Sequence, residues 1–211
     1  MTLHRLLVIG IVLVTLNATL GPARAQGDGP VHARQGFMIG LGLGGGSAVE
    51  DIDGGPDQDR AGGGAAAFRL GFGVSPSLVI GLESTAWLRQ DDDQLFGETV
   101  DVTTTLTTSG VALTWFPAPE GGFFVRGGLG FGRVAVELER GNVKAEASES
   151  GFGILFGIGH EWRLTRSFAL GIEGDFAVFG ISDLDVGEDE TADVSYNYAN
   201  LNLTGTWYFG N

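Results

Sequence analysis

Acidic side chains are the groups in this sequence whose spacing most directly suggests chemistry. Carboxylate oxygens are the ligands that Ca²⁺ and Mg²⁺ prefer. The segment 51–59 (DIDGGPDQD) differs from an EF-hand loop, because Gly55 and Pro56 stand where an acid and a glycine belong and no closing Glu follows. A solvated acidic fringe is the alternative to a specific site. The candidate divalent-cation ligands are Asp51, Asp53, Asp57 and Asp59.

Catalytic constellations are not evident. His160 is the only histidine after residue 32. A serine hydrolase needs a Ser near such a His and an acid to orient it, but Glu161 and Trp162 follow and no Ser lies close in phase. The glycine-rich stretches 40–46 and 127–132 lack the Lys-Ser/Thr of a phosphate loop. We therefore expect no enzymatic activity, and no cofactor beyond Ca²⁺ or Mg²⁺ at the acidic segments.

Charge and cysteine content exclude further classes. The 211 residues carry 12 basic and 26 acidic side chains, a formal net charge of −14. Such a balance argues against nucleic acid as a partner. The absence of cysteine excludes disulfides, thiolate metal sites, a Cys nucleophile and a lipid anchor on Cys.

The N-terminal residues have the pattern of a secretory signal peptide. Arg5 precedes an apolar stretch over 6–16, and Ala23-Arg24-Ala25 resembles a cleavage site. The stretch is too short for a membrane-spanning helix, which needs about 20 residues. We expect a signal peptide over 1–25, a flexible periplasmic lead-in over 26–34 and a single domain over 35–211.

That domain is dominated by apolar residues that alternate with a period of two, the pattern of β-strands. Short turns are expected at 75–77, 118–122 and 165–167, and longer polar loops at 49–62, 90–101, 138–149 and 181–192. Connections that alternate in length are typical of an up-and-down barrel. We predict an all-β fold, an eight-stranded antiparallel up-and-down transmembrane β-barrel, with ten strands as the alternative. The eight runs cover 37–43, 68–74, 78–88, 111–115, 123–131, 152–164, 168–178 and 199–209.

The second face of these strands indicates which way the apolar face points. It is rich in glycine, as in Gly40-Leu41-Gly42 and Gly128-Leu129-Gly130, and small residues suit a narrow lumen. The apolar face then points outward, towards lipid. The few large polar residues on the inner face form a predicted lumen charge network, namely Arg69, Glu83, Arg126, Glu161, Arg163, Glu173 and Asp175.

Aromatic residues on the outward face gather near the short turns. Trp at a membrane interface keeps its ring in the apolar layer and its N–H near water. We therefore predict an aromatic girdle of Phe72, Trp115, Phe123, Trp162, Phe168 and Trp207.

In these features the sequence resembles the small outer-membrane β-barrels of Gram-negative bacteria, the OmpA/OmpX-type eight-stranded barrels. The resemblance covers about 35–211 and is carried by Gly81-Leu82-Glu83, its echo Gly171-Ile172-Glu173, and the closing strand over 201–209 (LNLTGTWYF). It implies a location in the bacterial outer membrane and contact with outer-membrane lipid and lipopolysaccharide. It also implies insertion by a machinery that reads the C-terminal strand, although this chain ends two residues beyond its last aromatic, Phe209.

Several functions are compatible with such a barrel. We expect a monomer with both termini periplasmic and a structural or surface-interaction role, with acidic extracellular loops that could share divalent cations. A narrow pore or small-ligand-binding barrel is the alternative, and a lipid-modifying enzyme is disfavoured.

Turn length also predicts one pairing inside the lumen. A three-residue turn over 75–77 places Val74 opposite Leu78, and the same register places Arg69 opposite Glu83 on the inward face. A second cluster is expected in which Glu161, Glu173 and Asp175 face Arg126 and Arg163.

Overall fold

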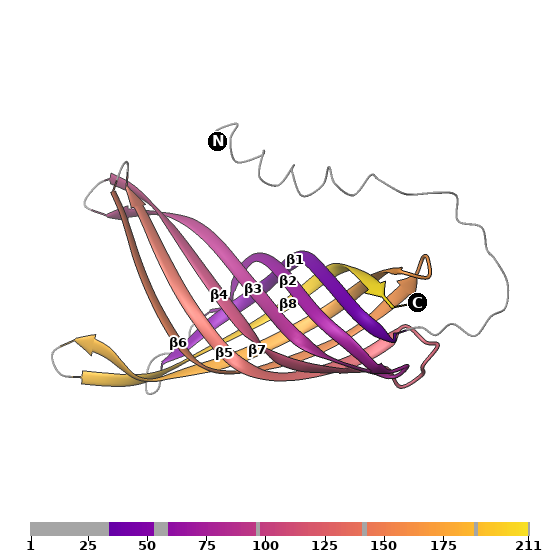
Figure 1. Ribbon diagram of the computed structural model, residues 1–211. Coiled ribbons are helices and arrows are strands. Elements are labelled where there is room, and N and C mark those ends of the chain that lie inside the picture. Colours follow the sequence, from indigo (N-terminus) through magenta and orange to yellow (C-terminus); the bar gives the residue numbers. More distant parts are fainter. Residues whose placement is uncertain (1–33, 53–58, 96–97, 141–142, 188–189, 211) are drawn as a thin grey trace. The chain divides into compact units, whose positions relative to one another are not determined.

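The computed structural model describes residues 34–52, 59–95, 98–140, 143–187 and 190–210. All regular structure in this part of the chain is β-strand (Figure 1). No helix among these residues is long and apolar enough to cross a bilayer. The strands are β1 (Gly36–Ile52), β2 (Ala61–Ser75), β3 (Leu78–Leu95), β4 (Glu98–Trp115), β5 (Phe123–Arg140), β6 (Val143–Arg163), β7 (Phe168–Gly187) and β8 (Glu190–Phe209).

The strands form a closed barrel in sequence order, because β1 pairs with β8 as well as with β2. Every neighbouring pair of strands is antiparallel. On the two sides of β1, Gly36 pairs with Gly73 of β2 and Phe37 pairs with Phe209 of β8. Closure leaves the backbone groups of the barrel wall hydrogen-bonded, which a lipid environment requires. The eight-stranded antiparallel barrel predicted from the alternation is confirmed.

Side chains alternate between the lumen and the outside as the sequence predicts. On β5, Phe131 is 72% exposed while its inward neighbours are buried or lie against the lumen. The outward apolar residues of this strand run from Phe123 to Phe131, and the next outward residue is Arg133. Nine residues rise about 30 Å along a strand, which a tilt of about 40° reduces to roughly the height of a membrane-facing band. Only the half of β5 nearer the short turns therefore lies in lipid.

The predicted extent of the four long polar loops is wrong, because strands occupy many of the residues assigned to them. In the structure the ladders continue through three of them, to Leu95–Glu98, Arg140–Val143 and Gly187–Glu190. There the outward face carries polar residues such as Arg133 and Glu137, so the outward apolar alternation that marks the lipid-facing part is lost, while the backbone ladder continues. In the segment over 49–62, β1 extends to Ile52 and β2 begins at Ala61.

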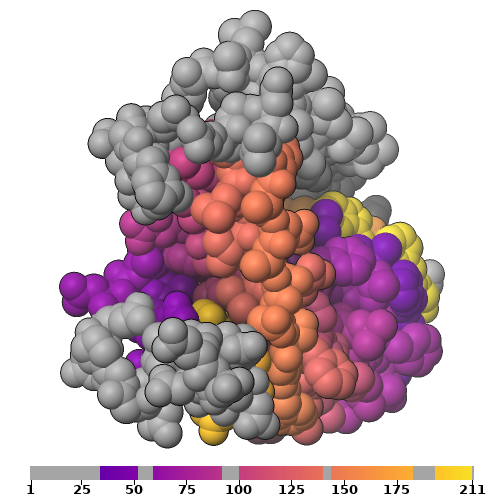
Figure 2. All heavy atoms as spheres, turned by 90° about the vertical axis from the view of Figure 1, so that its left-hand side faces the viewer, coloured from indigo at the N-terminus to yellow at the C-terminus, as the bar shows by residue number. Residues whose placement is uncertain are grey.

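Beyond the membrane band the barrel wall divides into two sheets. Pairing between β2 and β3 stops at Gly64–Leu88, and pairing between β6 and β7 stops at Phe152–Gly180. Strands β3 to β6 continue together as one sheet, and β7, β8, β1 and β2 as another (Figure 1). Seen towards the long-strand end, Figure 2 shows a recess between the purple atoms of β2 and the orange atoms of β6.

The turn between β2 and β3 differs slightly from expectation. Ser75, rather than Val74, pairs with Leu78, and a bulge lies between Gly73 and Ser75. The Ser77 amide donates to Ser75 Oγ at 3.3 Å, which tightens the turn. Because the bulge takes up the extra residue, the register from Gly73 inward is the predicted one.

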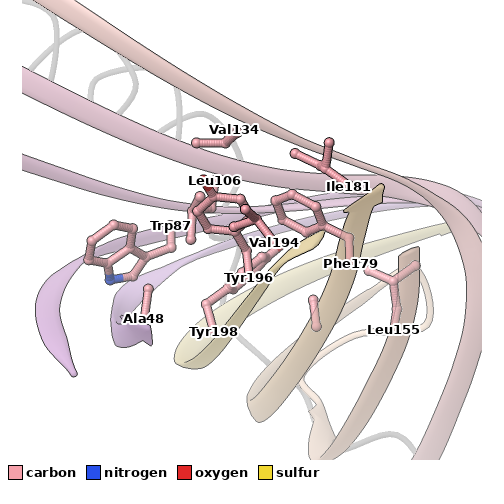
Figure 3. Close-up of a cluster of buried hydrophobic side chains, with 11 residues drawn as sticks. Ala48, Trp87, Leu106, Val134, Leu155, Phe179, Ile181, Val194, Tyr196 and Tyr198 are labelled. Carbon is pink, nitrogen blue, oxygen red and sulfur yellow. The ribbon is translucent and has the colours of Figure 1, made fainter. Parts of the chain in front are cut away.

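The lumen holds two apolar clusters at different depths. One lies near the short turns and contains Met38, Val79, Phe116, Phe124, Ala169 and Tyr208. The other lies further along the barrel and is drawn in Figure 3; it contains Ala48, Trp87, Leu106, Val134, Leu155, Ala177, Phe179, Ile181, Val194, Tyr196 and Tyr198. Side chains thus fill the interior above and below the charged residues described next.

Candidate functional site

Arg69 and Glu83 face each other inside the barrel. They are register partners on β2 and β3, and Arg69 Nε donates to Glu83 Oε1 at 3.0 Å. Both residues are about 95% buried. The predicted inward pairing of these two residues is confirmed.

Arg126 of β5 joins the same cluster from the opposite wall. Its Nη1 lies 2.9 Å from Glu83 Oε1, its Nη2 lies 3.4 Å from Glu173 Oε2, and its Nε donates to Thr114 Oγ1 at 3.1 Å. Arg69 also pairs with Glu173 and lies 3.7 Å from Asp175. Two guanidinium groups and three carboxylates therefore form one connected cluster across the lumen, which we call the central charge cluster: Arg69, Glu83, Arg126, Glu173 and Asp175.

The expected second cluster does not form as predicted. Glu173 and Asp175 do face Arg126, but they share it with Arg69 and Glu83. Glu161 and Arg163 lie nearer the short turns, at the end of β6. They belong to a separate group of residues that includes Arg34 and Tyr208. The spacing in the sequence correctly predicts that all seven charged residues lie on the inner face. It does not predict how far along the barrel axis each of them lies relative to residues on strands that are not its neighbours.

Amide and hydroxyl groups surround the central charge cluster. Asn202 Nδ2 donates to Asp175 Oδ2 at 2.8 Å, and the Tyr198 hydroxyl donates to the Thr85 carbonyl oxygen at 2.8 Å. Asn200 Nδ2 donates to Thr85 Oγ1 at 3.3 Å. Burial of charged groups is tolerated only when they are paired and hydrogen-bonded, and Asn202 supplies such a partner to Asp175 as Thr114 does to Arg126.

The extended part of the barrel contains a tyrosine paired with a carboxylate. Tyr196 donates to Glu50 Oε1 at 3.1 Å. Burial and the neighbouring Glu50 carboxylate raise the pKa of the Tyr196 phenol. The phenol therefore keeps its proton and serves as a hydrogen-bond donor at neutral pH.

Arg34 is the residue at the short-turn end that sequence reasoning missed. The sequence pattern predicts that it ends a flexible lead-in, but the side chain is almost completely buried and paired with Glu161 at 2.9 Å. The rest of the segment, 26–33, lies outside the described residues. A lone arginine before the first strand gives no periodic signal, so only its tertiary contacts reveal it.

Arg163 lies close to the same group of residues. Its guanidinium carbon is 4.3 Å from the centre of the Tyr208 ring, and its Nη1 donates to the Arg166 carbonyl oxygen at 3.2 Å. Tyr208 in turn donates to Glu161 Oε2 at 2.7 Å. Glu161 and Arg163 thus lie near one another, as parts of the short-turn end.

The aromatic residues predicted as a girdle lie on the outside near the short turns. Trp115, Phe123 and Trp162 are each about half exposed, and Phe72 is 56% exposed. Phe168 and Trp207 are register partners whose ring centres are 4.9 Å apart, and both are partly covered. Their position is compatible with a girdle, whose contact with the membrane interface stays a prediction.

The candidate cation ligands are only partly described. Asp51 and Asp59 are exposed, and Asp51 Oδ2 accepts a hydrogen bond from Asn197 Nδ2 at 3.3 Å. Asp53 and Asp57 lie outside the described residues. Within the described ranges, no group of three or more His, Cys, Asp or Glu residues could hold a metal ion.

A closed barrel with an apolar outside and a charged, packed inside defines a transmembrane β-barrel protein. A family model, the outer membrane protein beta-barrel domain, matches residues 12–209. The chain belongs to this family and is a protein of the bacterial outer membrane. It contacts outer-membrane lipid there. None of the curated proteins matches the sequence.

Solved structures of small outer-membrane barrels are similar in fold. Neisserial surface protein A has a TM-score of 0.54 and 11% identity, over 83% of this chain and 98% of that chain. OprG from Pseudomonas aeruginosa has a TM-score of 0.50 and 11% identity, over 85% and 99%. Ail of Yersinia pestis has a TM-score of 0.46 and 12% identity, over 81% and 99%. At these identities the similarity concerns the fold.

Proposed function

We propose that this protein is a non-enzymatic surface-interaction protein, which uses the barrel as an anchor and the protruding strands as the binding part. The observation that carries the proposal is the length of the strands. β6 has 21 residues, whereas crossing a bilayer as a tilted strand takes about 9–11. The outward residues of β6 become polar beyond Phe152, as Ser150, Ser148 and Glu146.

The protruding sheet also offers an exposed edge. Among the described residues, β6 over 143–151 pairs with β5 on one side, while its ladder with β7 begins only at Phe152. An unpaired edge can accept an extended segment of a partner as an added strand. Exposed charges such as Lys144 and Glu146 reduce indiscriminate pairing, so we propose a partner whose extended segment carries complementary charge.

The packed lumen favours this proposal over a pore. The central charge cluster spans the interior, and apolar clusters lie on both sides of it. The cavity between the central charge cluster and the short-turn end has a volume of about 20 Å³, room for about one water molecule. Stable single-channel steps of the purified protein in planar bilayers would favour the pore instead.

The proposal extends to how the chain is processed, inserted and oriented in the membrane. We propose that residues 1–25 direct secretion and are removed, and that the barrel acts as a monomer with both termini periplasmic and the long-strand end outside the cell. We also propose that the closing strand β8, which ends at Phe209, is read by the insertion machinery.

A truncation tests the binding role. Replacing 134–149 by a two-residue turn removes the paired ends of β5 and β6 and keeps the membrane band. Cells displaying the intact protein should adhere to immobilised extracellular proteins, and cells displaying the shortened protein should not. The heat-dependent electrophoretic shift of the folded barrel serves as the control for folding. Equal adhesion of both proteins, with equal surface amounts, would contradict the proposal.

A further inference from the structure

The chain turns into the barrel mouth just before β1. Gly36 has a φ of +92°, a conformation that glycine adopts readily and other residues rarely do. A Cβ at Gly73 would overlap the carbonyl oxygen of Arg34, so the backbone of Arg34 lies directly over Gly73. Two glycines therefore make it possible for the chain to direct Arg34 across the mouth.

A receptor for the Arg34 guanidinium group is formed by the opposite wall. Nε donates to Glu161 Oε1 at 2.9 Å, Nη1 donates to the carbonyl oxygen of Pro119 at 2.6 Å, and Nη2 donates to that of Gly121. The guanidinium carbon lies 3.6 Å from the centre of the Phe116 ring. A planar cation with donors on several edges fits such a site, whereas the compact ammonium group of lysine does not.

The receptor is held in place by contacts of its own. Tyr208 donates to the second carboxylate oxygen of Glu161 at 2.7 Å, and the Glu161 amide donates to the Gly122 carbonyl oxygen at 2.9 Å. Glu161 is 6% exposed. Without Arg34, the buried Glu161 carboxylate would lose this ion pair, which is costly.

We propose that this is a guanidinium-binding site at the short-turn end, and that Arg34 occupies it as an intramolecular latch across the mouth of the barrel. β1 pairs with β2 and β8, whereas the receptor comes from β6 and from the connection between β4 and β5. The latch can form only when these distant strands have been brought together by closure. It then lies against Phe116 and Glu161, two residues that also line the lumen cavity, and joins the start of the barrel to its far side.

Chemical rescue tests the site with the full-length mature barrel refolded in lipid vesicles. Arg34→Ala should lower the midpoint of urea unfolding, and ethylguanidinium at millimolar concentration should restore most of the loss. Ethylammonium at the same concentration should restore none of it. The matched control is Arg133→Ala, which removes an exposed arginine that lies 3.5 Å from Glu146 and should change the midpoint little.

A second variant tests the docking while keeping the guanidinium group. Gly73→Ala should push the Arg34 backbone away, and the amides of Gly121 and Glu161 should then exchange faster with solvent, as they should in Arg34→Ala. Unchanged exchange in both variants would overturn the latch. Rescue of Arg34→Ala by ethylammonium as effective as by ethylguanidinium would overturn the guanidinium site.

Discussion

Arg69 and Glu83 lie opposite each other on β2 and β3, with Nε and Oε1 3.0 Å apart in the interior of the barrel. Neither residue can be compensated by water, because Arg69 is only 5% exposed and Glu83 only 4%. Each therefore depends on the other and on Arg126 and Glu173 for compensation of its charge.

Removing one partner of this pair should cost more than removing both. We expect Arg69→Met and Glu83→Gln each to destabilise the barrel by about 3–5 kcal/mol, and the double variant to be destabilised less than either single variant. Urea unfolding of the four proteins in lipid vesicles gives the coupling energy. A coupling near zero would show that the charges are independently hydrated.

Glycines on the two faces of β5 should respond differently to the same substitution. A Cβ at Gly132 would overlap the Phe179 ring in the apolar cluster of Figure 3, so Gly132→Ala should destabilise by about 1–3 kcal/mol. Gly127 has nothing within 4 Å of an added Cβ, so Gly127→Ala on the same strand is the matched control. Equal unfolding midpoints for the two variants would contradict the lumen packing described above.

The orientation of the barrel can be checked with single cysteines, because the chain has none of its own. A membrane-impermeant maleimide should label Ser148→Cys on intact cells, since Ser148 lies on the exposed part of β6. It should label Ser77→Cys, in the turn before β3, only after the outer membrane is permeabilised. The opposite pattern would place the short turns outside the cell.

Divalent cations should bind weakly and without a single site. Calorimetry should show Ca²⁺ binding that is lost as salt is added, because exposed carboxylates are screened at physiological ionic strength. The double variant Asp51→Asn, Asp53→Asn should retain most of this binding. Loss of a tight, salt-resistant component in that variant would instead establish the specific site at Asp51, Asp53, Asp57 and Asp59.

The mature protein should begin at Gln26. Intact-mass spectrometry of protein extracted from outer membranes measures this directly. Ala25→Arg should slow processing, because the small residue at the cleavage site is replaced. A mass that still includes residues 1–25 would contradict the signal-peptide prediction.

Alternation determined much of this protein from the sequence alone. The period of two from Phe123 to Phe131, and its counterparts on the other strands, gave the strand number and the outward face. The short turn at 75–77 predicted the pairing of Arg69 with Glu83, and this register holds because the bulge between Gly73 and Ser75 takes up the one-residue difference at the turn. These features depend on local backbone geometry and on contact with one solvent, lipid.

Tertiary structure alone decided the remaining features. The ends of β3 to β6 continue as a sheet beyond the lipid-facing part, where backbone hydrogen bonds form without the outward apolar pattern that contact with lipid imposes. Arg126 meets Glu83 from a strand that is not its neighbour, and Arg34, just before β1, meets Glu161 of β6 across the closed lumen. Such contacts depend on the tilt and closure of the whole barrel, which set the depth of every inward side chain, and no periodicity within one strand carries that information.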